Sequence, residues 1–213
     1  MRRVTAEFDN QRPPRRSIVL SWIGQFYLWI RGWKMTTTLP ADPKLVMVAA
    51  PHTSNWDGWI LIMAIWVARA NLTWMIKDEA AKIPLIGHFI KWMGGVGINR
   101  KSSHNIVGAS VEQLQQADEM MLLVAPEGTR KKSDHWKTGF YWIAYNANVP
   151  MLCARMDYST KTISFTGPYQ ATGNLEADME KIWADYRPIG ALHPEKVSDM
   201  RLRDRDKKRF ASE

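Results

Sequence analysis

Short apolar runs alternate with longer, helix-like segments along most of this 213-residue chain, and that alternation limits the folds open to it. The short runs fit strands that are buried within a sheet. Strands that alternate with helices form α/β layered domains. We therefore predict a single α/β domain with a mixed, largely parallel sheet flanked by helices. The predicted strands are 45–50, 72–76, 96–98, 120–124, 149–156 and 162–166. The predicted helices are 58–70, 84–93, 103–117, 138–146 and one that starts at Asn174 or Asp178 and ends at Tyr186.

The first 34 residues differ from the rest of the chain in charge. They carry seven basic and two acidic side chains, whereas the whole chain has a formal net charge of +8. Residues 18–33 look helical and contain Trp22, Phe26, Tyr27, Trp29 and Trp33. These features are typical of a helix lying in a lipid head-group layer, although a helix packed on the domain shares them. We predict a basic arm and interfacial amphipathic helix in 1–34, one domain in 35–190 and a charged C-terminal tail in 191–213.

Three features bear on the compartment. The longest apolar runs, 18–30 and 59–68, fall short of the roughly 20 residues that span a bilayer. The first residues lack the apolar run of a secretory signal. The lone cysteine, Cys153, excludes an internal disulfide framework and favours a reducing compartment. We expect a peripheral or monotopic protein on the cytoplasmic face of a membrane.

A polar loop follows the predicted strand 45–50 and contains His52 and Asp57. A turn that runs into a helix can bring the two side chains together. Asp57 would then accept a hydrogen bond from one imidazole nitrogen and leave the other as a base near neutral pH. This arrangement is a triad without its own nucleophile, which the hydroxyl of an acceptor substrate would supply. The alternative is that Asp57 only caps the following helix.

A second polar loop, Pro126-Glu127-Gly128-Thr129-Arg130, follows the predicted strand 120–124. Gly128 permits a backbone turn that other residues resist. The Thr129 hydroxyl and the forked Arg130 cation suit a phosphate oxyanion. Glu127 can orient the arginine or contact a substrate hydroxyl. The alternative is an exposed polar turn.

The glycines of a third segment, 94–100, do not fit the spacing of a nucleotide-binding loop, and Arg100 ends the predicted strand there. No metal site is predicted, because the other four histidines show no zinc-ligand spacing. Those histidines are His88, His104, His135 and His193.

The ordered set of these segments resembles the glycerolipid acyltransferases, of which the 1-acyl-sn-glycerol-3-phosphate (lysophosphatidate) acyltransferases are the best-known members. The first motif is His52-x4-Asp57, the second is 94–100, the third is 126–130, and 149–152 is similar to the fourth. The resemblance extends over about residues 45–160, within the predicted domain 35–190.

The resemblance implies that His52 is the general base and Asp57 its partner. It implies that the acceptor phosphate is held by Arg100, Glu127, Gly128, Thr129 and Arg130. It further implies acyl-CoA or acyl carrier protein as the donor, a lysophospholipid acceptor at a membrane surface, and no bound cofactor or metal. Lysophosphatidate, converted to phosphatidate, is the acceptor we expect.

Two alternatives remain open. Pro51, Ala125 and Cys153 depart from the family's usual residues, so the acceptor can instead be a lyso-ornithine-lipid, a glycolipid or another alcohol. The second alternative is a non-enzymatic protein whose basic termini bind a membrane or nucleic acid. It leaves the polar motifs unexplained, and we predict no nucleic-acid partner.

Overall fold

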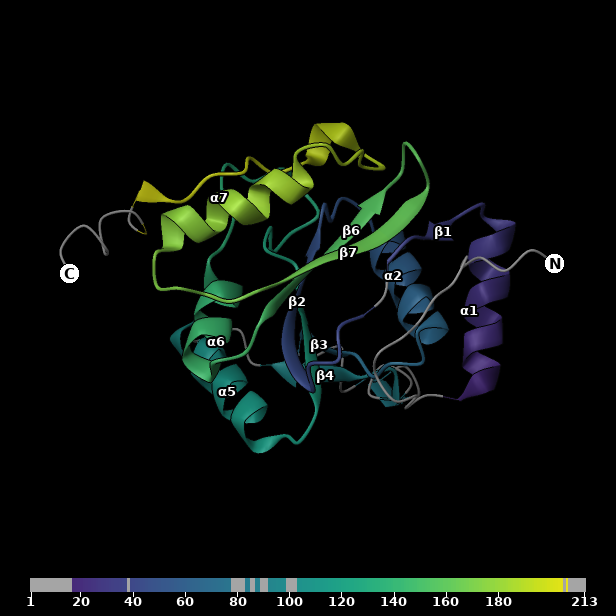
Figure 1. Cartoon of the computed structure of the whole chain (residues 1–213), viewed down its shortest axis with the longest axis horizontal. Coiled ribbons are helices and arrows are strands. Elements are labelled where there is room, and N and C mark those ends of the chain that lie inside the picture. The colour runs from purple at the N-terminus through teal and green to yellow at the C-terminus, as the bar shows by residue number, and fades with distance from the viewer. Residues whose placement is uncertain are drawn as a thin grey trace.

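A seven-stranded mixed sheet forms the centre of the protein, with the strand order β1-β7-β6-β2-β5-β3-β4 (Figure 1). The structure is a computed structural model that describes residues 17–37, 39–77, 83–84, 87–88, 92–98, 103–204 and 206. All neighbouring strands are parallel except β6 and β7, which are antiparallel. The strands are β1 Lys34–Met35, β2 Lys44–Ala50, β3 Thr73–Lys77, β4 Gly95–Ile98, β5 Met120–Val124, β6 Met151–Asp157 and β7 Thr162–Tyr169.

Helices cover both faces of this sheet, which confirms the predicted α/β fold with a mixed, largely parallel sheet. Figure 1 shows α1 and α2 on one side and α5, α6 and α7 on the other. The helices are α1 Ile18–Ile30, α2 Asn55–Val67, α5 Ser103–Gln116, α6 Gly139–Ala147 and α7 Leu175–Tyr186, followed by the short 3-10 helix η1 Pro194–Lys196. Half of the predicted helix 84–93 lies outside the described residues.

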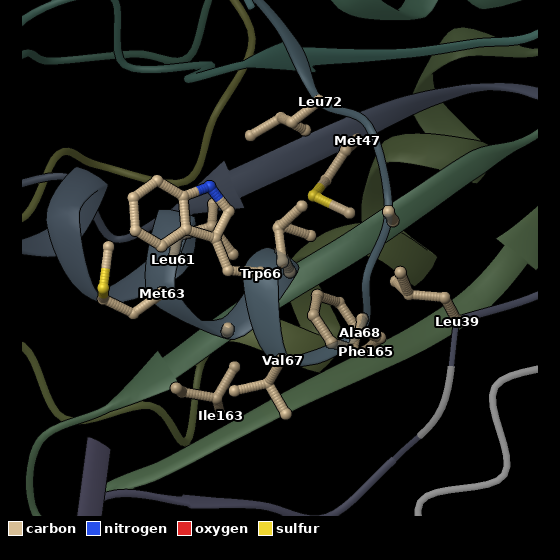
Figure 2. Close-up of a cluster of buried hydrophobic side chains, with 14 of the residues drawn as sticks. Leu39, Met47, Leu61, Met63, Trp66, Val67, Ala68, Leu72, Ile163 and Phe165 are labelled. Carbon is tan, nitrogen blue, oxygen red and sulfur yellow. The ribbon is translucent and has the colours of Figure 1, made fainter. Parts of the chain in front are cut away.

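The alternation of side chains along β2 divides the core into two clusters. Leu45, Met47 and Ala49 pack with α2 on one face, and the residues between them pack with α6 and α7 on the other. Figure 2 shows the first cluster, in which Trp66 and Leu61 of α2 lie with Met47 and with Phe165 of β7. Both faces of β2 are buried from Leu45 onward. A strand buried on both faces needs apolar side chains at every position, which is why the run from Leu45 to Ala50 is continuously apolar.

Three parallel strands at the middle of the sheet end at the same edge. Val48 of β2 is in register with Val124 of β5, and Ala50 of β2 is in register with Arg155 of β6. The loops that follow these strands therefore lie side by side, at the edge where α/β proteins usually bind their ligands.

Helix α1 uses a narrow face to contact α2 and leaves a wide apolar face exposed. Ser21, Gly24 and Leu28 are buried, and a Cβ at Gly24 would lie 2.6 Å from the carbonyl oxygen of Met63, so the two helices pack closely. The exposed apolar face, as we call it below, consists of Ile18, Val19, Trp22, Ile23, Phe26, Trp29 and Ile30. One face of the helix thus packs on the domain, whereas the expectation that the helix lies in a lipid head-group layer stays a prediction. Among the described residues, no helix has the length and apolar character needed to cross a membrane.

The end of the chain is bound more closely to the domain than its charge suggests. We expected a solvated helix or tail; residues 197–203 form neither a helix nor a strand, and Ser198 and Leu202 are buried. The Ser198 hydroxyl accepts a hydrogen bond from the Ser133 amide at 3.1 Å, and the Trp136 amide donates to the Arg201 carbonyl at 3.1 Å. The segment thus covers the loop that follows β5.

Candidate active site

The loop after β2 brings His52 and Asp57 together. The Nδ1 atom of His52 lies 3.7 Å from Oδ2 of Asp57, and Asp57 is fully buried while 27% of the His52 side chain is exposed. This separation exceeds the length of the hydrogen bond we expected, and it becomes an ion-pair contact only when the imidazole is protonated. Nδ1 is thus the ring nitrogen within 4 Å of the carboxylate, which leaves Nε2 as the candidate proton acceptor.

Asp57 also caps α2, so the alternative role predicted for it is present as well. Its Oδ2 atom accepts hydrogen bonds from the amides of Thr53 (2.6 Å) and Ser54 (2.7 Å), and Ser54 caps the helix in return. The predicted start of this helix was residue 58. The capping box explains why α2 begins earlier, at Asn55. The same bonds fix the carboxylate that faces His52.

The surroundings of His52 favour its neutral form. Burial lowers the pKa of His52 below its usual value of 6.5, Asp57 opposes that shift, and Arg130 adds to it. A neutral imidazole near physiological pH has a nitrogen lone pair available to accept a proton.

Glu127, from the loop after β5, is turned inward. It is 1% exposed, and its Oε2 atom accepts a 2.7 Å hydrogen bond from the backbone amide of His52. Its other oxygen accepts from the Ser198 amide at 3.5 Å. Burial raises the pKa of Glu127, and these two bonds oppose the rise. In the structure this carboxylate binds the backbone amides of His52 and Ser198, and the expected contact with Arg130 or a substrate stays a prediction.

The rest of that loop faces solvent. Gly128 has a positive φ of 64°, which L side chains rarely adopt, and the Lys137 side chain would have to move to admit a Cβ there, so the position favours glycine. Thr129 and Arg130 are exposed, and the Arg130 guanidinium donates to the side-chain oxygen of Asn55 at the start of α2. The structure thus brings Glu127, Gly128, Thr129 and Arg130 beside His52 and Asp57. Arg100 lies outside the described residues.

The two loops that form this site lie in the part of the chain that matches a known protein family. A sequence model of the Acyltransferase family matches residues 34–157, which include both loops. The chain belongs to the Acyltransferase family. The match confirms the resemblance drawn from the four motifs.

Two relatives give the family match more detail. A Mycoplasma pneumoniae protein named "Probable 1-acyl-sn-glycerol-3-phosphate acyltransferase" is 33% identical over 153 residues, which cover 68% of this chain and 57% of that protein. The match thus spans less than two thirds of the relative's length. The crystal structure of the 1-acyl-sn-glycerophosphate (LPA) acyltransferase PlsC from Thermotoga maritima shares the fold, with a TM-score of 0.57 and 20% identity over 78% of this chain and 74% of that one.

The structure of this Acyltransferase-family chain adds three residues that the motifs did not indicate. Asn55 contacts Arg130, Lys137 lies against Gly128, and the Tyr158 hydroxyl donates to Oδ1 of Asp57 at 2.6 Å. Each comes from a different segment. Tyr158 could have been found by examining every residue that follows a parallel strand.

Other residues with reactive side chains stay outside the site. Burial raises the pKa of Cys153 to about 12, so its thiol is a core group and a poor nucleophile, in keeping with its apolar strand. Over the part of the chain that the structure describes, no group of His, Cys, Asp and Glu side chains could hold a metal ion.

Proposed function

We propose that this chain moves a fatty acyl group from a thioester carrier to the hydroxyl of a lysophospholipid, with lysophosphatidate as the lead acceptor and phosphatidate as its product. One observation carries the proposal: a partly exposed imidazole faces a buried carboxylate, beside an exposed loop that presents Thr129 and Arg130. The names of the two relatives support the same acceptor.

The proposed reaction uses His52 as general base. Its Nε2 atom takes the proton of the acceptor hydroxyl while that oxygen attacks the thioester carbonyl. The new C–O bond replaces the C–S bond, and the carrier leaves as a thiolate that recovers a proton from the imidazolium. Asp57 stabilises the imidazolium between these two steps. Acyltransferases of this family need no cofactor, and acyl-CoA and acyl carrier protein are both suitable thioester donors.

The test is mass spectrometry of lipids after incubation with mixed donors and acceptors. Acyl-CoA and acyl carrier protein are each paired with lysophosphatidate, a lyso-ornithine-lipid and a glycolipid. Phosphatidate as the main product supports the proposal. Acylation of a phosphate-free acceptor alone replaces lysophosphatidate with that acceptor, and a folded protein that acylates none of them contradicts the proposal.

Arg130 is expected to hold the acceptor phosphate. Arg130→Ala loses a charge-assisted contact, so the acceptor KM should rise about 10-fold or more, whereas the donor KM should change little. Arg187→Ala is the matched control, since it removes an exposed arginine that pairs with Glu180 on α7. Steady-state kinetics with each substrate varied in turn measures the effect. An unchanged acceptor KM would remove Arg130 from the phosphate site.

The proposed lipid substrate requires a membrane, and the exposed apolar face of α1 is the surface we propose for it. Arg31 and Lys34 are exposed just after this helix, and the Lys161 ammonium donates to the Arg31 carbonyl at 3.2 Å. An apolar face with cations at its end suits a leaflet rich in anionic lipid, as on the cytoplasmic side of a membrane.

Vesicle binding should separate an apolar contribution from this surface and an electrostatic contribution from the basic residues that precede it in the sequence. Trp22, Phe26 and Trp29 are about half exposed or more, so replacing all three by Ala should preserve the fold and abolish the binding that persists at high salt. Replacing Arg12, Arg15 and Arg16 should remove much of the salt-sensitive binding, at about 1 kcal/mol for each arginine near the surface. Co-sedimentation at low and high salt measures both contributions.

The control for vesicle binding is Leu28→Ala on the buried face of α1. It should lower the melting temperature, because Leu28 is fully buried, and leave lipid binding by the folded protein intact. If the folded triple aromatic variant binds vesicles as well as the wild type, α1 is not the membrane contact.

A further inference from the structure

Tyr158 reaches the site from a third strand. It follows β6 directly, and β6 runs parallel to β2, so Tyr158 lies at the same sheet edge as the His52 loop. Its amide donates to the Gly190 carbonyl at 2.8 Å, which fixes the backbone at that point. The tyrosine is outside the four motifs and comes 101 residues after Asp57.

The tyrosine ring is held from behind by Trp33. The two ring centroids lie 4.9 Å apart with an interplanar angle of 89°, the edge-to-face arrangement that aromatic pairs favour. Trp33 is 3% exposed, and its amide donates to the Leu28 carbonyl at 2.8 Å. The C-terminal end of α1 is therefore linked through two aromatic rings to the site.

The hydroxyl of Tyr158 completes the set of hydrogen bonds to Asp57. Within the described part of the chain, the backbone amides bound to that carboxylate hold its Oδ2 atom, and Tyr158 donates to Oδ1 at 2.6 Å. Burial and the adjacent Asp57 carboxylate raise the pKa of Tyr158 well above its usual range, so the hydroxyl stays protonated and acts as a donor. With both oxygens bound, the carboxylate can neither rotate nor draw away from His52 without breaking a bond to a buried charged group.

We propose that Tyr158 is a positioning residue for the acyl transfer, whose hydroxyl fixes the Asp57 carboxylate opposite His52. This inference rests on the proposed function, since it assigns Tyr158 a part in the same reaction. Tyr158 touches no reacting atom and acts through Asp57. Its contribution lies in the orientation of the imidazole and in the proton affinity of the His52–Asp57 pair.

The first test is Tyr158→Phe, which keeps the ring against Trp33 and removes only the hydroxyl. We expect kcat to fall about 10-fold, the usual effect of losing one hydrogen bond to a charged group, while both KM values stay within about two-fold of the wild type. The matched control is Tyr169→Phe, which removes a 2.7 Å tyrosine bond to Asp185 and should leave kcat unchanged. Thermal melts confirm that each variant is folded.

The second readout is the titration of His52, which a purely structural role of Tyr158 would not alter. The charged groups nearest His52 are Asp57, Arg130 and Glu127, and Tyr158→Phe leaves all three in place. Without the Tyr158 hydroxyl, the Asp57 carboxylate keeps more of its negative charge toward His52, so His52 should titrate at higher pH in Tyr158→Phe than in the wild type. The midpoint of the NMR titration of His52, measured without substrate, and the pH of the acid limb of the rate profile should both rise.

The outcomes separate this inference from the proposed function. Unchanged kcat and an unchanged titration of His52 in folded Tyr158→Phe overturn the positioning role. The positioning role is also overturned if Tyr169→Phe lowers kcat as much as Tyr158→Phe does. It is overturned as well if Tyr158→Phe raises a KM value together with the fall in kcat. If the wild type acylates no lipid, the proposed function fails, and the NMR titration still decides whether Tyr158 sets the proton affinity of the pair.

Discussion

His52→Ala should lower kcat at least about 100-fold, the lower bound of what a general base usually contributes. The fold should survive, because the backbone amide of His52, and not its side chain, binds Glu127. The imidazole is also partly exposed, so its removal leaves no deep cavity. Turnover of acyl donor and acceptor, measured beside a thermal melt, tests both expectations.

The pH profile of the wild type provides a second measure of the same base. His52 must be neutral to accept a proton, so the rate rises with pH through its pKa. Since burial lowers that pKa, the acid limb of kcat/KM should lie below pH 6.5. His193→Ala is the control, because the amide of His193 donates to Thr53 next to the site while its side chain is partly exposed. Near-wild-type turnover by folded His52→Ala would exclude the mechanism.

The sequence predicted the fold well wherever the information is local. Strand β5 has the bounds expected from its apolar run, and the other main strands agree within a few residues. Strand β1 was missed because its two residues carry no periodic signal, and they form a strand only by pairing with β7. Helix α2 began earlier than expected because Asp57 and Ser54 cap it in a reciprocal arrangement.

The site was predictable to the extent that its loops follow parallel strands. His52 with Asp57 and the 127–130 loop meet because β2 and β5 are neighbours, as an α/β sheet allows. The inward turn of Glu127 was not predictable, since its two amide partners come from positions 75 and 71 residues away in the chain. The catalytic and binding roles of these residues stay predictions.

The C-terminal segment shows why charge alone misleads. Its many charged residues predicted a solvated tail, yet Ser198 and Leu202 are buried while Asp199 and Arg201 between them are exposed. The Ser198 amide also bonds Glu127, so this segment supports the His52 loop indirectly. Net charge describes the exposed side of such a segment and says nothing of the side that packs.

Asp57→Asn should lower kcat at least about 100-fold, although the shape of the side chain is preserved. An asparagine oxygen can still accept from the amides of Thr53 and Ser54, and its NH2 group can donate to the Tyr158 oxygen. The negative charge is lost, however, and an imidazolium at His52 then forms without a counter-charge 3.7 Å away. The variant should therefore fold and bind both substrates while the chemical step fails.

The cost to stability should be modest, and a second aspartate provides the comparison. Asp178 occupies a similar place in α7: it is buried in the first turn and accepts from the Tyr141 hydroxyl and the Thr172 amide. Asp57→Asn and Asp178→Asn should each lower the free energy of unfolding by on the order of 1–2 kcal/mol. Of these two variants, only Asp57→Asn should abolish turnover, because Asp57 faces His52, whereas Asp178 bonds Tyr141 and Thr172. Equal losses of activity in the two variants would mean that Asp57 serves the fold alone, and the proposed base would then lack its partner.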